Sequence, residues 1–147
     1  MRIQAKAVTV LLLVTFLAPV LTFEATAKTT TCSQKQKSAV KKHITKQISA
    51  MAESDWKAAY GYAAKSFQSS IPIELFAEII ETQYEFLMVN DGYAFGVCKN
   101  SKNAYSQIVS VDFEGAKRTL YYELILVGKR MGVVSATEVI EKPGLAV

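Results

Sequence analysis

The apolar residues change their spacing at the turn Asn90–Asp91–Gly92, and this change constrains the fold more than any other feature of the chain. Before the turn, apolar residues recur every three or four positions, which is the period of an amphipathic helix. After it, apolar and polar residues alternate, as in a strand with one buried face. Helices followed by consecutive strands are typical of the α+β class. The 147 residues leave room for one such domain.

Three helical stripes precede this turn. The first helix is expected to begin at Ser38, because residues 28–37 (KTTTCSQKQK) are polar and show no apolar period. Ser54 and Asp55 supply a break and an N-cap for the second helix, and Pro72 fits the first turn of the third. The apolar positions of the three stripes are, in chain order, Val40, Ile44, Ile48 and Met51; Trp56, Ala59, Tyr60, Ala63 and Phe67; and Phe76, Ile79, Ile80, Tyr84 and Leu87.

Four strand candidates follow, over Tyr93–Lys99, Tyr105–Phe113, Lys117–Val127 and Met131–Ile140. Short turns join them, so we expect an antiparallel meander of three to four strands. A curved sheet that wraps around the three helices would bury all the apolar stripes at once. We therefore predict one α+β domain over residues 38–141, with an extended lead-in over 28–37 and a loose tail over 142–147.

The first 27 residues have the composition of a signal peptide. Arg2 and Lys6 make a short positive region, and Ala7–Phe23 carries no charge. Ala25 and Ala27 then form the small-x-small pattern of a cleavage site, so we predict a cut after Ala27 and a secreted, periplasmic or cell-envelope location. The alternative is an uncleaved anchor, because the uncharged run is near the lower length limit for crossing a bilayer.

Cys32 and Cys98 are the two cysteines of the chain. In an exported protein an even cysteine count favours a structural disulfide, here from the lead-in to the first long strand. The alternatives are two free thiols, or pairing with another protein. Three threonines precede Cys32, which does not fit a lipid-attachment pattern. The spacing is not Cys-x-x-Cys, so thioredoxin-like redox chemistry is not indicated.

The run ITKQISAMAESDWKAAYGYAAKSFQSSIP resembles the opening of a family of exported bacterial proteins called domain of unknown function 4864. The chain departs from that family at Met131, Gly132 and Val133, where members commonly carry a Gly-Trp-aromatic motif. The resemblance implies a cystatin-like or nuclear transport factor 2-like fold, with a cone-shaped sheet around helices, and it implies no known activity. The matching positions are Gln47–Met51, Asp55–Phe67, Phe76–Tyr84 and Tyr93–Ile140.

Cone folds elsewhere include isomerases and dehydratases that use an Asp or His with a Tyr in the pocket. The candidates for pocket-lining residues are Trp56, Tyr60, Tyr84 and Tyr122. The alternative is that these aromatics only fill the core. Asp112 falls on the polar side of its strand, so no buried carboxylate is available as a base, and we predict no catalytic residue.

His43 is the single histidine, and Lys41, Lys42 and Lys46 lie close to it in sequence. We expect a surface histidine, because no orienting carboxylate lies near it on the helix. One histidine and two distant cysteines do not have the spacing of a zinc site. No metal and no cofactor are therefore predicted.

Charge is distributed unevenly over the helices. Cleavage after Ala27 would leave 15 basic and 12 acidic residues, a net charge of +3, which is too small to indicate a nucleic-acid partner. The basic patch could contact anionic lipid headgroups or cell-wall polymers, the basic and acidic patches could attract each other in a homodimer, or both could simply be solvated. They are the basic run Lys28, Lys35, Lys37, Lys41, Lys42 and Lys46 and the acidic stripe Glu74, Glu78, Glu81 and Glu85.

These features favour an exported, non-enzymatic binding or accessory domain that takes a small ligand or a cell-envelope protein partner. One alternative is a small isomerase- or dehydratase-like enzyme with an aromatic-lined pocket. Another is a structural subunit of an envelope complex. Contact with a membrane is expected only through the signal segment, if that segment is not cleaved.

Overall fold

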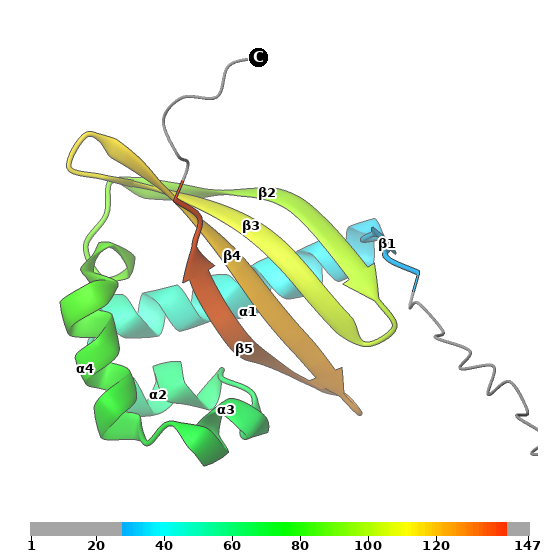
Figure 1. The fold of residues 1–147 in the computed structure, drawn as a ribbon, viewed down its shortest axis with the longest axis horizontal. Helices are drawn as coiled ribbons and strands as arrows, with labels where there is room; N and C mark the ends of the chain where they lie inside the picture. The colour runs from blue at the N-terminus through cyan, green and yellow to red at the C-terminus, as the bar shows by residue number, and fades with distance from the viewer. Residues whose placement is uncertain (1–27, 141–147) are drawn as a thin grey trace, which may run out of the picture.

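The computed structural model describes residues 28–140, in which the helices lie on one side of an antiparallel sheet (Figure 1). The predicted signal segment and the tail over 142–147 lie outside these residues. The elements are, in chain order, β1 (Thr30–Thr31), α1 (Gln34–Ala52), α2 (Trp56–Gly61), α3 (Lys65–Ser70), α4 (Ile73–Gln83), the 3-10 helix η1 (Glu85–Leu87), β2 (Gly92–Ser101), β3 (Ala104–Phe113), β4 (Ala116–Val127) and β5 (Arg130–Glu138).

The sheet is open, with the strand order β1-β2-β3-β4-β5, and every neighbouring pair is antiparallel. Strands β2 to β5 form the predicted meander, and the α+β class is confirmed. Within residues 28–140 there are four α-helices rather than three, and five strands rather than three or four. The differences arise at the lead-in and in the second predicted helix.

Helix α1 begins at Gln34, four residues before the expected start. The Ser33 side chain accepts a hydrogen bond from the Gln36 backbone N–H, and the Gln36 side chain accepts one from the Ser33 N–H. This capping box satisfies two N–H groups that a helix start otherwise leaves without partners. The predicted extended lead-in over 28–37 is therefore wrong from Gln34 onward, although Thr30–Thr31 is extended and pairs with β2.

The second predicted helix is divided into α2 and α3 by a contact with the sheet. Between them the Ala64 N–H donates to the Val133 carbonyl (2.7 Å), and the Val133 N–H donates to the Tyr62 carbonyl (2.9 Å). Gly132 makes this approach possible, because a Cβ there would lie 2.5 Å from the Ala64 Cα. A continuous helix would have used the Ala64 N–H internally, so the prediction of one helix from Trp56 to Phe67 is wrong.

The helices and the sheet share one core. Helix α4 starts after Pro72 as predicted, but it ends at Gln83 and is followed by η1. Asp112 is exposed and pairs with Lys117, so the expectation that it points away from the core is confirmed. The predicted stripe of α1 is buried, and it packs in one core with buried residues of the two central strands: Val40, Ile44, Ile48 and Met51 of α1, Tyr105, Val109 and Val111 of β3, and Leu120, Tyr122 and Leu124 of β4.

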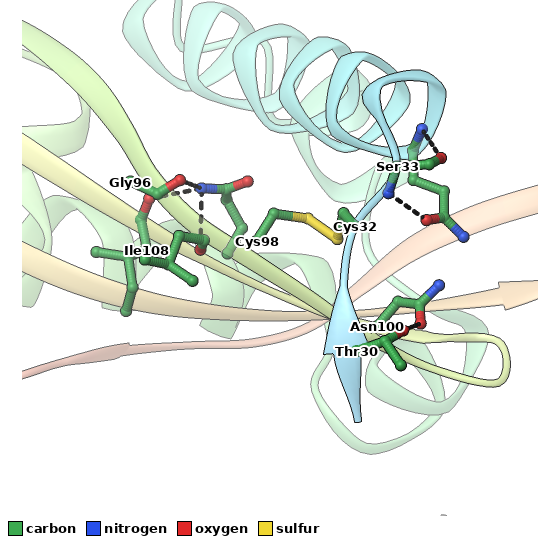
Figure 2. Close-up of a disulfide and its surroundings, with 10 residues drawn as sticks. Thr30, Cys32, Ser33, Gly96, Cys98, Asn100 and Ile108 are labelled. Atoms are coloured by element: carbon green, nitrogen blue, oxygen red, sulfur yellow. Dashed lines mark hydrogen bonds between the residues drawn. A yellow bond between two sulfur atoms is a disulfide. The ribbon is translucent and has the colours of Figure 1, made fainter. Parts of the chain in front are cut away.

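One polar side chain of β3, that of Gln107, lies in this core beside a β-bulge in β2. The register of β2 on β3 shifts between Phe95 and Cys98. Gln107 is fully buried there, and its amide nitrogen lies 3.0 Å from the Gly96 carbonyl and 2.8 Å from the Ile108 carbonyl (Figure 2). The glutamine thus supplies donors to carbonyls near the bulge.

A disulfide joins Cys32, just before α1, to Cys98 in β2 (Figure 2). The two Cα atoms are 5.5 Å apart, and both residues are buried. The Cys32 N–H also donates to the Cys98 carbonyl (3.1 Å), and the Thr30 hydroxyl donates to the Asn100 side chain (2.8 Å). The bridge therefore fixes the start of α1 to the β2 side of the sheet.

Replacing both cysteines, by Cys32→Ala and Cys98→Ala, should lower the free energy of unfolding by about 4 kcal/mol. The two residues are 66 positions apart, and opening such a loop returns that much chain entropy to the unfolded state. Urea denaturation would measure the change, and wild-type protein in a reducing agent should match the double variant. Equal stability of oxidised wild type and double variant would contradict this prediction.

Candidate ligand-binding pocket

An apolar pocket of about 220 Å³ lies between the helices and β5. Engineered cavities of about 150 Å³ lined by apolar side chains bind benzene, so the volume suffices for a small organic molecule. The helical side of the wall comprises Met51, Phe67, Phe76, Ile79, Ile80 and Leu87, with Gln47, Ala63, Ile71 and Tyr84 beside them. The sheet side comprises Tyr122 of β4 and Val133, Val134, Ser135 and Ala136 of β5.

The structure brings two of the four predicted residues, Tyr84 and Tyr122, to the pocket wall. Trp56 and Tyr60 do not line it. Both contact the wall residue Phe76, with ring centroids 6.4 Å and 5.7 Å away, respectively. The Tyr60 hydroxyl is directed elsewhere, since it lies within hydrogen-bond distance of the Gln68 and Ile71 carbonyls and holds the end of α3.

The hydroxyl of Tyr122 is buried and has no hydrogen-bond partner among the described residues. The residue is 1% exposed, and its side chain forms part of the pocket wall. Burial raises the pKa of this phenol far above its ordinary value, and the neighbouring Tyr93 and Tyr84 add to the effect. Tyr122 is therefore a neutral phenol throughout the physiological pH range. Leaving such a group without a partner costs about 1–3 kcal/mol.

Two other polar side chains of the pocket, those of Gln47 and Ser135, have partners within the protein. The amide nitrogen of Gln47 lies 3.3 Å from the Ala59 carbonyl, and the Ser135 hydroxyl donates to Glu123 (2.7 Å). The described residues that line the pocket include no Asp, Glu, His, Lys, Arg or Cys. The wall thus offers apolar surface, two tyrosines and no charge.

Several wall residues were not anticipated from the sequence. Gln47 is a polar residue between the buried Ile44 and Ile48, and this exception in the stripe could have drawn attention to it. Val133 and Ala136 were placed in a strand, but the alternation pattern does not tell which helix covers a strand. Their place in the wall depends on the long-range contact of Ala64 with β5.

His43 lies outside this pocket and is half-buried, so the expectation of a surface histidine holds only in part. Its Nε2 lies 2.8 Å from the Tyr62 carbonyl, so Nε2 carries a proton and donates. Burial lowers the pKa of His43, the hydrogen bond to Tyr62 opposes that shift, and Lys46 adds to it. His43 borders a second, more open hollow of about 320 Å³, together with Lys35 and Lys129. Its clear role is to tie α1 to the segment after α2.

The lysines of α1 and the glutamates of α4 are exposed, except Lys37, which is partly buried. The salt bridges within residues 28–140 are Lys117–Asp112 and Arg118–Glu138, so the two charged patches do not pair with each other inside the domain. Residues 28–140 contain no group of three or more His, Cys, Asp or Glu side chains that could hold a metal ion.

Comparison with known proteins places the described domain in a sequence family. A family described as a domain of unknown function, DUF4864, matches residues 33–147. The match starts at Ser33, the N-cap of α1, and includes every later element of the structure. No curated protein and no solved structure matches the chain.

Tyr122→Phe should raise the free energy of unfolding by about 1 kcal/mol, because it removes the unpartnered hydroxyl and keeps the ring. Urea denaturation at neutral pH would measure the gain, and Tyr121→Phe, at the exposed neighbour on the other face of β4, should have little effect. A loss of stability in Tyr122→Phe would show that a bound water partners the hydroxyl.

The protonated Tyr122 phenol favours the folded state over a defined pH range. Because its folded-state pKa is raised, this contribution is fully present below the unfolded-state pKa of about 10 and declines as pH rises above it. Wild type should therefore lose stability more steeply than Tyr122→Phe above pH 10.

Proposed function

Since the chain belongs to the domain of unknown function family DUF4864, which has no assigned activity, we propose that it is an exported, non-enzymatic domain that binds a small ligand in the apolar pocket. The observation that carries this proposal is the pocket itself, whose wall is almost entirely apolar and carries no charged side chain. Small-molecule sites are typically apolar concavities with a few placed polar groups.

The composition of the wall supports binding better than catalysis. General acid–base chemistry requires a group that exchanges a proton near the working pH. Tyrosine is the only titratable residue type among the described lining residues, and burial makes Tyr122 a poorer base or acid still. The isomerase- or dehydratase-like alternative lacks the carboxylate or imidazole that it needs in this pocket.

Export is part of the proposal. The N-terminal 27 residues have the composition of a signal peptide, and the disulfide between Cys32 and Cys98 suits an oxidising compartment. Within residues 28–140, no helix is long and apolar enough to cross a membrane.

The proposal also includes a bacterial origin and a cystatin-like or nuclear transport factor 2-like arrangement. The open antiparallel sheet with helices on one side supports that arrangement (Figure 1). A cell-envelope protein as partner, a homodimer and a structural role in an envelope complex remain alternatives to the small ligand. A protein partner would bind at the exposed charged faces of α1 and α4.

Expression of the full chain in a bacterium should yield an exported protein that starts at Lys28. Intact mass spectrometry would show loss of residues 1–27 and a mass two hydrogen atoms below the reduced value, because of the disulfide. An Ala27→Arg variant should be retained with its leader, since signal peptidase requires a small residue there. A lipid on Cys32, or a wild-type chain that keeps residues 1–27, would contradict the proposed export route.

Ala136→Phe should weaken the binding of a small apolar probe such as 2-naphthol by at least about tenfold. The new ring would occupy the pocket next to Tyr122. Thr137→Phe is the matched control: it adds the same ring one residue later, where β5 is exposed and faces away. NMR titration would give both affinities, and circular dichroism would verify folding. Unchanged binding in Ala136→Phe would exclude this pocket as the site.

A further inference from the structure

We infer that the hollow between α1 and the β4–β5 hairpin is a second binding site, which takes a small organic carboxylate with an apolar body. The hollow has a volume of about 320 Å³ and shares no lining residue with the apolar pocket. The inference therefore goes beyond the proposed function and does not depend on it. It follows from the charge that borders the hollow and from the apolar side chains inside it.

Positive charge borders the hollow from two elements. Lys35 lies in the first turn of α1, and Lys129 lies in the turn between β4 and β5. Within residues 28–140 neither lysine forms a salt bridge, and no Asp or Glu lines the hollow. A bound carboxylate would thus meet two cations that no acidic side chain of the described residues neutralises.

The sequence of α1 strengthens this positive field. The helix runs from Gln34 to Ala52 and contains five lysines and no Asp or Glu. The N-terminal end of a helix favours negative charge, yet the first turn carries Lys35 and Lys37 and no acidic residue. These lysines alone reduce the stability of the helix, and a carboxylate bound beside Lys35 would offset that effect.

The inner wall of the hollow is apolar, which favours an organic anion over a simple ion. Leu126 and Met131 are partly buried and pack against the hydrophobic core, and Tyr105 belongs to that core. A ring or a short chain that covers these side chains would remove apolar surface from water. Acetate or an inorganic anion would gain the contacts with the lysines and little else. The hollow thus matches a molecule with a charged end and an apolar body.

His43 lines the same hollow but supplies no charge at neutral pH. Burial lowers its pKa, and its Nε2 proton is donated to the Tyr62 carbonyl. The lysines therefore carry the attraction to the anion. His43 is also the single histidine of the chain, so its ring signals in an NMR spectrum report directly on the occupancy of this hollow.

The test titrates the mature protein, with its disulfide intact, with 2-naphthoate, 2-naphthol and acetate at neutral pH. 2-Naphthoate should shift the NMR signals of the His43 ring and give intermolecular contacts to the Met131 methyl group. 2-Naphthol lacks the charge and acetate lacks the apolar body. Each should therefore bind at His43 more weakly than 2-naphthoate, by about fivefold or more.

Lys35→Gln and Lys129→Gln should each weaken 2-naphthoate binding at His43 by about fivefold. Lys41→Gln is the matched control, because it removes the same charge from the same helix. Lys41 lies over the Phe95 ring of β2, 5.6 Å from its centroid, and does not line the hollow. Circular dichroism would verify that all three variants fold.

Three outcomes would overturn the inference. The first is equal affinity of acetate or 2-naphthol and 2-naphthoate at His43. The second is an equal loss of affinity in Lys41→Gln and Lys35→Gln, which would indicate attraction by the overall charge of the helix. The third is no binding of 2-naphthoate at His43. The proposed function is tested separately by the effect of Ala136→Phe, because Ala136 lines the apolar pocket and not this hollow.

Discussion

The contact between the segment after α2 and strand β5 is the interaction on which the rest of the structure depends. The Tyr62 carbonyl accepts hydrogen bonds from the Val133 N–H and from His43 of α1, while the Ala64 N–H donates to the Val133 carbonyl. One short segment thereby connects the long helix, the helical layer and the edge strand. Gly132 permits this approach, because no side chain separates β5 from Ala64. It also holds α3 against β5, and residues of α4 and β5 line the pocket nearby.

The sequence predicted the elements whose causes are local. All four long strands lie within two residues of their predicted bounds, because alternation of apolar and polar residues is a local pattern. The early start of α1 also has a local cause, the Ser33–Gln36 capping box, and could have been predicted. The break between α2 and α3 could not, since it depends on backbone groups of β5 about 70 residues later in the chain. Alternation along β3 places Gln107 on the buried face with Tyr105 and Val109, but it does not predict the bulge in β2, where the Gly96 carbonyl accepts a hydrogen bond from the Gln107 amide.

The candidate site was predictable only in part, for a related reason. Helical spacing places Trp56, Tyr60 and Phe76 on apolar faces, but it does not say which face meets which strand. Tyr60 was assigned to the pocket by its residue type, whereas its hydroxyl is used to hold the end of α3. Tyr122 differs from it in one respect: a central strand carries it into the core, where the described residues offer its hydroxyl no partner. Its place in the pocket wall depends on how the helices pack against β4 and β5, which neither aromatic character nor the strand pattern predicts.

The disulfide helps to explain how so small a domain retains an open apolar pocket. An unfilled volume and a buried hydroxyl without a partner both reduce stability, the hydroxyl alone by about 1–3 kcal/mol. Closing the chain between Cys32 and Cys98 contributes about 4 kcal/mol in the opposite direction. The bridge lies at the start of α1, away from the pocket wall, and neither cysteine lines the pocket. The bridge and the pocket thus lie in different parts of the fold, while Phe76, Ile80 and Tyr122 of the wall belong to the hydrophobic core as well.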